Sequence, residues 1–190
     1  MNYVHNLLDK NGYSYVWQNK DKYSEEMFQK FLNQFTQTLS DTYHQNQQSI
    51  INDCHSNKYN FYRKIKTHPY CEEYLKYISI PSHRIAVTKL RTSDHKLGVE
   101  TGRYYTIPYN DRHCEYCKSS KIDDEMHFIF ECTHNMPERR ACQVIQDSVK
   151  ISRTSTLETI FLDKFSCIDF SKYIYSSFQA RISRSKSTTS

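Results

Sequence analysis

Three cysteines and one histidine in a short segment have the spacing of a tetrahedral metal site. They are Cys114, Cys117, His127 and Cys132, in the pattern C-x2-C-x9-H-x4-C. Two cysteines separated by two residues can turn both sulfurs inward on a tight turn, and a second ligand pair after a short loop completes the tetrahedron that Zn²⁺ adopts. Four protein ligands leave no open coordination position. We therefore expect one structural Zn²⁺ that does not activate water.

Other cysteines and histidines are weaker candidates for ligands. His113 adjoins Cys114 and would strain the chelate, while His134 would give the second pair a spacing of six residues, so we expect both to be solvated. Cys142 is expected to be a small buried residue in a helix. The alternatives to zinc are unligated cysteines in a decayed sequence and redox chemistry. The remaining cysteines have no partner nearby in the sequence and are expected to be core or surface thiols: Cys54, Cys71 and Cys167.

An acidic run inside the same segment could be catalytic, but capping is the preferred interpretation. Asp123, Asp124 and Glu125 could hold Mg²⁺, yet they directly precede His127 and a short apolar run, which is typical of a helix N-terminus. His95 has no nucleophile or paired carboxylate nearby in the sequence and is interpreted as a structural histidine. The sequence therefore predicts no enzymatic activity.

Composition indicates a folded intracellular protein with a lean core. The chain has 190 residues, of which 37% are hydrophobic, and a net charge of +5. Its three glycines are too few for a nucleotide-binding loop. The odd number of cysteines, seven, argues against a disulfide framework. No apolar run suits a membrane span or a signal peptide, so we expect a soluble protein of the nucleus or cytoplasm.

The expected fold is mostly α, a small helical domain with a zinc knuckle inserted between helices. The clearest amphipathic helix follows Ser24, a plausible N-cap. Pro81 suits the start of a helix over residues 82–91, and Gly98 and Gly102 interrupt the helical pattern. Helical periodicity returns over residues 137–149, 156–163 and 168–182.

Four segments follow from this pattern. Residues 1–80 form a helical N-terminal part with the long amphipathic helix, in which Tyr13–Trp17 is briefly extended. Residues 81–140 comprise a basic helix and the zinc knuckle, residues 141–180 form C-terminal helices, and residues 181–190 form a flexible basic tail. Because the chain has a core besides the knuckle, we expect metal removal to unfold only about residues 112–140.

Charge is arranged in blocks, with the acidic knuckle between two basic segments. Three thiolates, Zn²⁺ and a neutral imidazole sum to −1, so the knuckle itself is a poor partner for phosphates. We infer that its basic neighbours bind RNA or DNA with low sequence specificity. The candidate contacts, which could also be an ordinary solvated surface, are Arg84, Lys89, Arg91, Lys96, Arg103 and Arg112.

The region from residue 90 to residue 132 resembles the segment that follows the polymerase in non-LTR (LINE-type) retrotransposon reverse transcriptases. In that family the motif L-R-x-S-x-H-x-L-x-[IV]-E-x-G-R leads into a Cys-Cys-His-Cys zinc-binding domain. The matching residues are Leu90, Arg91, Thr92, Ser93, His95, Leu97, Val99, Glu100, Gly102, Arg103, Arg112, Cys114, Cys117, Asp124, Glu125, His127, Phe128 and Cys132.

The resemblance implies contact with element RNA or target DNA, and association with the polymerase part of a retroelement protein. It does not carry the polymerase activity over, because the chain lacks the aromatic-Ala-Asp-Asp box of the polymerase palm. The leading interpretation is thus a zinc-stapled, non-catalytic nucleic-acid-binding module. The alternative is a protein-interaction or scaffold module in which zinc is purely structural. An exposed apolar patch on the long helix would favour this alternative.

Overall fold

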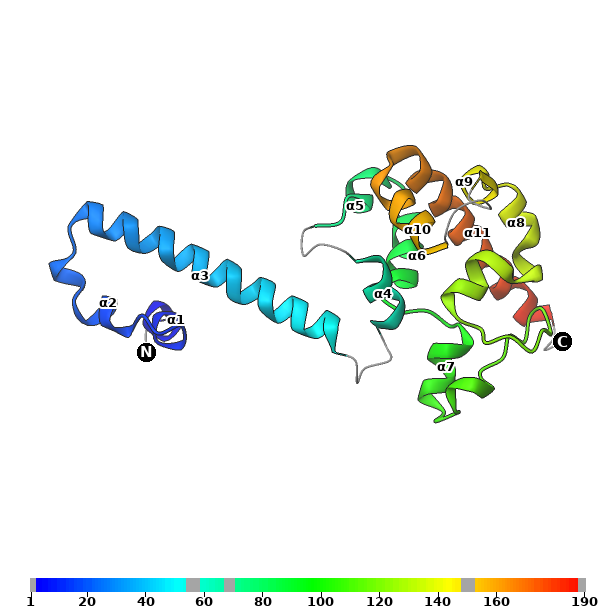
Figure 1. Ribbon diagram of the computed structural model, residues 1–190, viewed down its shortest axis with the longest axis horizontal. Coiled ribbons are helices and arrows are strands. Elements are labelled where there is room, and N and C mark those ends of the chain that lie inside the picture. The colour runs from blue at the N-terminus through cyan, green and yellow to red at the C-terminus, as the bar shows by residue number, and fades with distance from the viewer. Residues whose placement is uncertain (1–2, 54–58, 67–70, 148–152, 188–190) are drawn as a thin grey trace. The chain divides into compact units, whose positions relative to one another are not determined.

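The chain folds into helices that belong to two units, Met1–Asp53 (unit 1) and Cys54–Ser190 (unit 2) (Figure 1). The predicted mostly α-helical fold is confirmed: the described residues contain no β-strand, only one antiparallel bridge between His113 and Ile122. The division between the units falls inside the predicted segment 1–80. The computed structural model describes residues 3–53, 59–66, 71–147 and 153–187.

Unit 1 has a small apolar core of its own. Leu8, Val16 and Phe31 are buried in it. Ser24 is the N-cap of the long helix, as the sequence predicts, and its Oγ accepts a hydrogen bond of 3.3 Å from the amide of Met27. The helical elements of the unit are α1 (Tyr3–Lys10), α2 (Ser14–Gln18), the 3-10 turn η1 (Lys20–Lys22) and α3 (Glu25–Asn52).

The expectation of an extended segment at Tyr13–Trp17 is wrong, because α2 occupies this stretch. Tyr13 packs edge-on against the rings of Phe31 and Phe35, with ring centroids 5.6 and 5.3 Å apart, and Val16 is buried in the same core. Residues three apart share a helix face but lie on opposite faces of a strand. A helical turn therefore lets both side chains reach the core.

Several large apolar side chains of α3 are exposed. Phe31 is buried, but Met27, Phe28, Tyr43 and Ile50 are 51%, 41%, 59% and 54% exposed. The apolar face of this amphipathic helix is thus only partly buried.

Unit 2 is a bundle of shorter helices around the C-terminal helix α11. None of the described helices of the chain is long and apolar enough to cross a membrane. The elements of unit 2 are α4 (Asn60–Ile65), α5 (Tyr74–Tyr77), α6 (Pro81–Arg91), α7 (Gly98–Tyr104), η3 (Tyr109–Asp111), the π-helical turn η4 (His127–Glu131), η5 (Thr133–Asn135), α8 (Met136–Arg140), α9 (Gln143–Asp147), α10 (Arg153–Leu162) and α11 (Lys164–Ser187).

Helix α11 organises the core of unit 2. It packs against α6, α10, α5, α9 and α8. Leu90 of α6, Phe170 and Ile174 of α11, and Phe128 and Ile129 of η4 are fully buried in one continuous cluster. The η4 turn, which carries His127, is therefore part of the main core.

The expectations for the two glycines and for the C-terminal tail are wrong. Gly98 and Gly102 do not interrupt helical structure, because both lie within α7. The tail predicted from residue 181 begins too early: α11 continues to Ser187, and Arg181 is only 4% exposed. A buried carboxylate, Asp123, pairs with Arg181 and holds this part of the helix against the knuckle.

Gly102 is required by a close approach between α7 and Arg112. A Cβ at Gly102 would lie 2.7 Å from both Cγ and Cδ of Arg112. The guanidinium of Arg112 donates hydrogen bonds to the carbonyls of Val99 (2.7 Å) and Ile107 (2.9 Å), which fixes its side chain over α7. The steric requirement outweighs the modest cost of glycine inside a helix.

Candidate metal centre

A short antiparallel loop presents the first ligand pair. The amide of Cys114 donates to the carbonyl of Lys121 (2.9 Å), and the amide of Asp123 donates to the carbonyl of Arg112 (2.8 Å). These bonds close a loop with the bridge His113–Ile122 at its neck. Lys118 has a φ of 51°, so the chain turns back directly after Cys117. Both sulfurs are thus held on a tight turn, as the spacing predicts.

In the second pair, His127 is the first residue of the π-helical turn η4 and Cys132 directly follows its last residue. The amide of Cys132 donates to the carbonyl of His127 (2.8 Å), a bond between residues five apart. Asp124 lies three residues before η4, and its Oδ1 accepts a hydrogen bond of 2.7 Å from the amide of His127. The predicted capping role is confirmed for Asp124.

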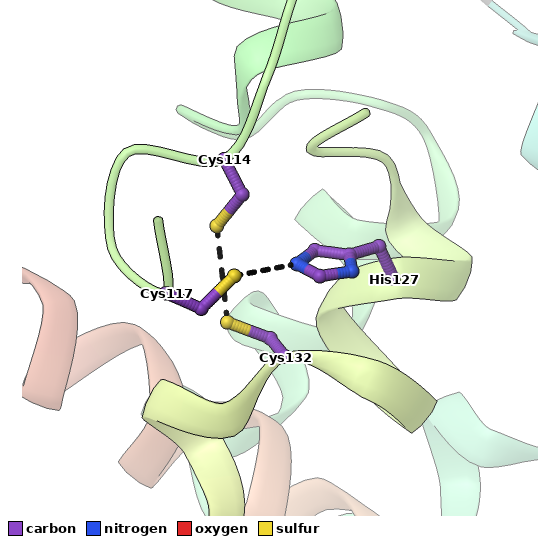
Figure 2. Close-up of side chains that lie close together, drawn as sticks. All are labelled: Cys114, Cys117, His127 and Cys132. Carbon is purple, nitrogen blue, oxygen red and sulfur yellow. Dashed lines mark hydrogen bonds between the residues drawn. The ribbon is translucent and has the colours of Figure 1, made fainter. Parts of the chain in front are cut away.

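The four side chains point toward one another from these two elements, as Figure 2 shows. Their ligand atoms all lie within 4.8 Å of one another. Cys114 Sγ is 3.8 Å from Cys132 Sγ, and Cys117 Sγ is 3.3 Å from His127 Nε2. A tetrahedral Zn²⁺ with Zn–S bonds of about 2.3 Å separates two sulfurs by about 3.8 Å. The cluster can therefore hold a metal ion with only small adjustments.

Hydrogen bonds and charge at the cluster favour thiolate on two of the sulfurs. Cys114, His127 and Cys132 are buried and Cys117 is half-buried. The hydrogen bond from Cys114 lowers the pKa of Cys132, with further contributions from His127 and the charge of Arg181, whereas the same bond and burial raise the pKa of Cys114. Burial opposes ionisation of Cys117, but hydrogen bonds from Ser119, Cys114 and His127 outweigh it and lower the pKa.

His127 is the counterpart of these sulfurs. The hydrogen bond to Cys132 raises the pKa of His127. Burial lowers this pKa, the hydrogen bond to Cys117 raises it further, and the result is a pKa of about 9. Because thiolate and neutral imidazole are the forms that bind metal, an ion would displace protons from the cluster.

The acidic side chains next to the cluster form hydrogen bonds and an ion pair within the chain. Asp124 caps η4, Asp123 pairs with Arg181 at 3.0 Å, and Glu125 accepts hydrogen bonds from Ser93 and His95. The capping interpretation is wrong for Asp123 and Glu125, because their partners lie far away in the sequence. His95 is a structural histidine, as expected, with its side chain 1% exposed.

The remaining cysteines and histidines among the described residues lie outside the cluster. His113 is exposed, as expected, but His134 is buried, with its ring centroid 5.2 Å from that of Tyr116. Cys142 and Cys167 are buried, and Cys71 is exposed. Cys54 lies outside the described residues.

Arg91 cannot serve as the predicted phosphate contact. It is 1% exposed, its Nη2 lies 2.8 Å from Glu72 Oε2, and its guanidinium carbon lies 4.2 Å from the centroid of Phe161. The expectation is wrong because Arg91 lies on the core-facing side of α6, where the ring of Phe161 in α10 and the carboxylate of Glu72, which precedes α5, enclose it.

The other predicted contacts differ in their availability. Arg84 donates to the carbonyls of Leu75 and Ile78, Arg103 pairs with Glu100 at 2.8 Å, and Arg112 donates to Val99 and Ile107. The two that are exposed are Lys89 and Lys96.

The sequence alone did not single out two features of this region. Tyr104, Tyr105 and Tyr109 are 73%, 76% and 43% exposed, next to Arg103, whose guanidinium carbon lies 4.9 Å from the ring of Tyr104. The adjacent Arg-Tyr-Tyr run is the signal that could have drawn attention to them. The other feature is the position of Arg181 beside the cysteines, which no local sequence pattern indicates.

No family model, curated protein or solved structure matches this chain.

Proposed function

We propose that unit 2 binds one structural Zn²⁺ at Cys114, Cys117, His127 and Cys132. The convergence of their ligand atoms within 4.8 Å carries this proposal. Thiolates and imidazole suit zinc, whereas Mg²⁺ and Ca²⁺ prefer oxygen ligands. With four protein ligands, the ion would join the 114–122 loop to η4 and leave no position for substrate or water.

Metal analysis of the purified chain tests this proposal. We expect one zinc per chain. Cys117→Ser and Cys132→Ser should each lose most of it, while Cys71→Ser, an exposed cysteine outside the cluster, should retain it. Absence of zinc, or an unchanged zinc content in the Cys117→Ser variant, would contradict the ligand assignment.

We propose further that unit 2 is a non-catalytic nucleic-acid-binding module, equivalent to the C-terminal segment of a non-LTR retroelement reverse transcriptase. Support comes from the motif spanning residues 90–132. Its partners would be element RNA or target DNA and the polymerase part of the same protein. The zinc would hold the fold, and residues outside the knuckle would make the contacts.

The exposed tyrosines at and beyond the C-terminal end of α7 are the observation that favours nucleic acid. Tyr104, Tyr105 and Tyr109 present aromatic rings beside Arg103. Base stacking on exposed aromatic rings contributes about 1–3 kcal/mol per base and depends little on sequence. Lys89 and Lys96 remain as exposed cations for the phosphates, whereas Arg91 is excluded by its burial.

Salt-titrated binding to single-stranded RNA and DNA oligonucleotides tests this function. With two or three phosphate contacts at about −0.7 each, we expect log K against log salt to have a slope near −1 to −2. Tyr105→Ala should weaken binding about 5-fold or more. Tyr43→Ala, which removes an exposed tyrosine of unit 1, should leave binding unchanged. A slope of zero, or an unaffected Tyr105→Ala variant, would contradict the proposal.

A second candidate function is a protein-interaction module. The exposed Met27, Phe28, Tyr43 and Ile50 of α3 favour it, because large apolar side chains on a helix are typical of a surface that another protein covers. Under this alternative, oligonucleotide binding would be absent or independent of salt, and zinc would still stabilise unit 2.

A further inference from the structure

Arg181 of α11 is buried beside the metal centre and held by Asp123. Its Nη1 lies 3.0 Å from both carboxylate oxygens of Asp123. The side chains of Arg181 and Asp123 are only 5% and 4% exposed. Burial of such an ion pair costs free energy unless the remaining donors and acceptors of both groups are also hydrogen-bonded. The guanidinium of Arg181 is therefore expected to have a second interaction partner.

The second terminal nitrogen of Arg181 is directed at the sulfurs. Its Nη2 lies 3.4 Å from Cys132 Sγ and 3.7 Å from Cys114 Sγ. Asp123 thus engages one nitrogen of the guanidinium and leaves the other for the cysteines. One ligand of each pair receives a hydrogen bond from the same cation.

Two aromatic rings fix the plane of this guanidinium. Its central carbon lies 4.5 Å from the ring centroid of Tyr116 and 4.8 Å from that of Phe128. Tyr116 lies between the two cysteines of the first pair, and Phe128 follows His127. Arg181 therefore contacts the chain on both sides of the metal centre and donates to a sulfur from each side.

We propose that Arg181 is an outer-sphere positioning residue of the zinc centre, which stabilises the metal-bound thiolates by charge and by N–H···S hydrogen bonds. The inference rests on the proposed zinc site. Three thiolates, one imidazole and Zn²⁺ carry a net charge of −1 in a buried environment, where an adjacent cation is most effective. Because Arg181 belongs to α11, metal binding and docking of this helix support each other.

Zinc affinity of the full chain, measured by competition with a chromophoric chelator, is the first test. Loss of outer-sphere partners typically lowers metal affinity about 10–100-fold, and we expect a loss in this range for Arg181→Met. Arg181→Lys keeps the charge but not the geometry, so it should recover part of the loss. Lys172→Met removes an exposed cation from the same helix and should have no effect.

Arg181→Met also leaves Asp123 buried without a cation, so a second variant separates the two effects. In the double variant Arg181→Met, Asp123→Asn the buried charge is gone, and the amide oxygen can still accept the hydrogen bond from the Gly98 amide. If Arg181 acts on the sulfurs, the double variant still binds zinc more weakly than the wild type. If the double variant regains wild-type affinity, Arg181 serves only to pair with Asp123 and the inference is overturned.

Cobalt substitution gives a spectroscopic signal that would not change on replacement of Arg181 if this residue had a purely structural role. Hydrogen bonds to a thiolate lower the energy of its electrons, so their loss should shift the sulfur-to-cobalt charge-transfer band to longer wavelength in Arg181→Met and in the double variant. An unshifted band together with unchanged affinity would overturn the inference while leaving the zinc site intact. Failure of the wild type to bind metal would instead overturn the zinc site itself, and the inference with it.

Discussion

His95 Nε2 lies 3.0 Å from Glu125 Oε1, and this contact joins the segment that follows α6 to the turn that carries His127. Nδ1 of His95 accepts a hydrogen bond from the Leu97 amide, so Nε2 carries the proton and donates to Glu125. The hydroxyl of Ser93 donates to the same carboxylate oxygen at 3.0 Å. The contacts of Ser93 and His95 with Glu125 therefore position the turn that carries His127.

Replacement of Glu125 should destabilise unit 2. Glu125→Ala leaves two buried donors, Ser93 and His95, without their acceptor, and we expect a loss of about 2–4 kcal/mol in the free energy of unfolding. Ser93→Ala removes one donor and should cost about 1 kcal/mol. Urea denaturation of the zinc-loaded chain measures both. Equal stabilities for wild type and Glu125→Ala would show that this network does not support the fold.

A methyl group at position 102 should displace Arg112. In Gly102→Ala, the new Cβ would lie 2.7 Å from the Arg112 side chain, so the arginine must give up its bonds to Val99 and Ile107. We expect a destabilisation of about 1–3 kcal/mol. In an Arg112→Ala background the clash is absent, and Gly102→Ala should be neutral or slightly stabilising. Equal effects in both backgrounds would refute the steric explanation.

Tyr173 should make the stability of unit 2 sensitive to alkaline pH. Its hydroxyl donates to the carbonyls of Ile129 (2.6 Å) and Phe128 (3.3 Å), and burial raises its pKa to about 12. In the unfolded chain the pKa is about 10, so the native state holds the proton more tightly and this stabilisation is lost as pH rises from about 10 to 12.

Tyr173→Phe isolates this effect. The variant should cost about 1–2 kcal/mol near neutral pH, and the difference from wild type should shrink between pH 10 and 12. Tyr105→Phe, which alters an exposed tyrosine, serves as the control and should be neutral throughout. A Tyr173→Phe deficit that stays constant over this pH range would contradict the assignment.

Metal removal should loosen α11 as well as the knuckle. The sequence predicts unfolding of only about residues 112–140, but Tyr173 and Arg181 of α11 bind η4 and the cysteine sulfurs directly. Hydrogen exchange with and without a zinc chelator measures this. We expect faster exchange over residues 173–181 and no change in α3, which belongs to unit 1. Acceleration restricted to residues 112–140 would favour the prediction from sequence.

The cluster of Cys114, Cys117, His127 and Cys132 could be predicted from sequence because its four members are close in the chain and their spacing reflects local turns. The α6 start at Pro81 and the α3 cap at Ser24 are equally local. The roles of Arg91 and Arg181 could not be predicted, because their carboxylate partners, Glu72 and Asp123, reach them only through tertiary packing.

The two glycines of α7 led the prediction from sequence in the wrong direction. Gly98 and Gly102 argue against a helix by propensity, yet both lie in α7. A Cβ at Gly98 would lie 3.0 Å from Asp123 Cβ, and one at Gly102 would overlap Arg112. Close packing against the knuckle explains both residues. That packing partner cannot be recognised from the local pattern.

X-ray absorption spectroscopy at the zinc K-edge on the purified chain tests the central claim most directly. We expect the zinc to be coordinated by three sulfurs at about 2.3 Å and one nitrogen at about 2.0–2.1 Å. Cys117→Ser should reduce the sulfur count to two in whatever zinc remains. A coordination shell with oxygen ligands, with fewer than three sulfurs in the wild type, or one unaffected by Cys117→Ser would contradict the proposed centre.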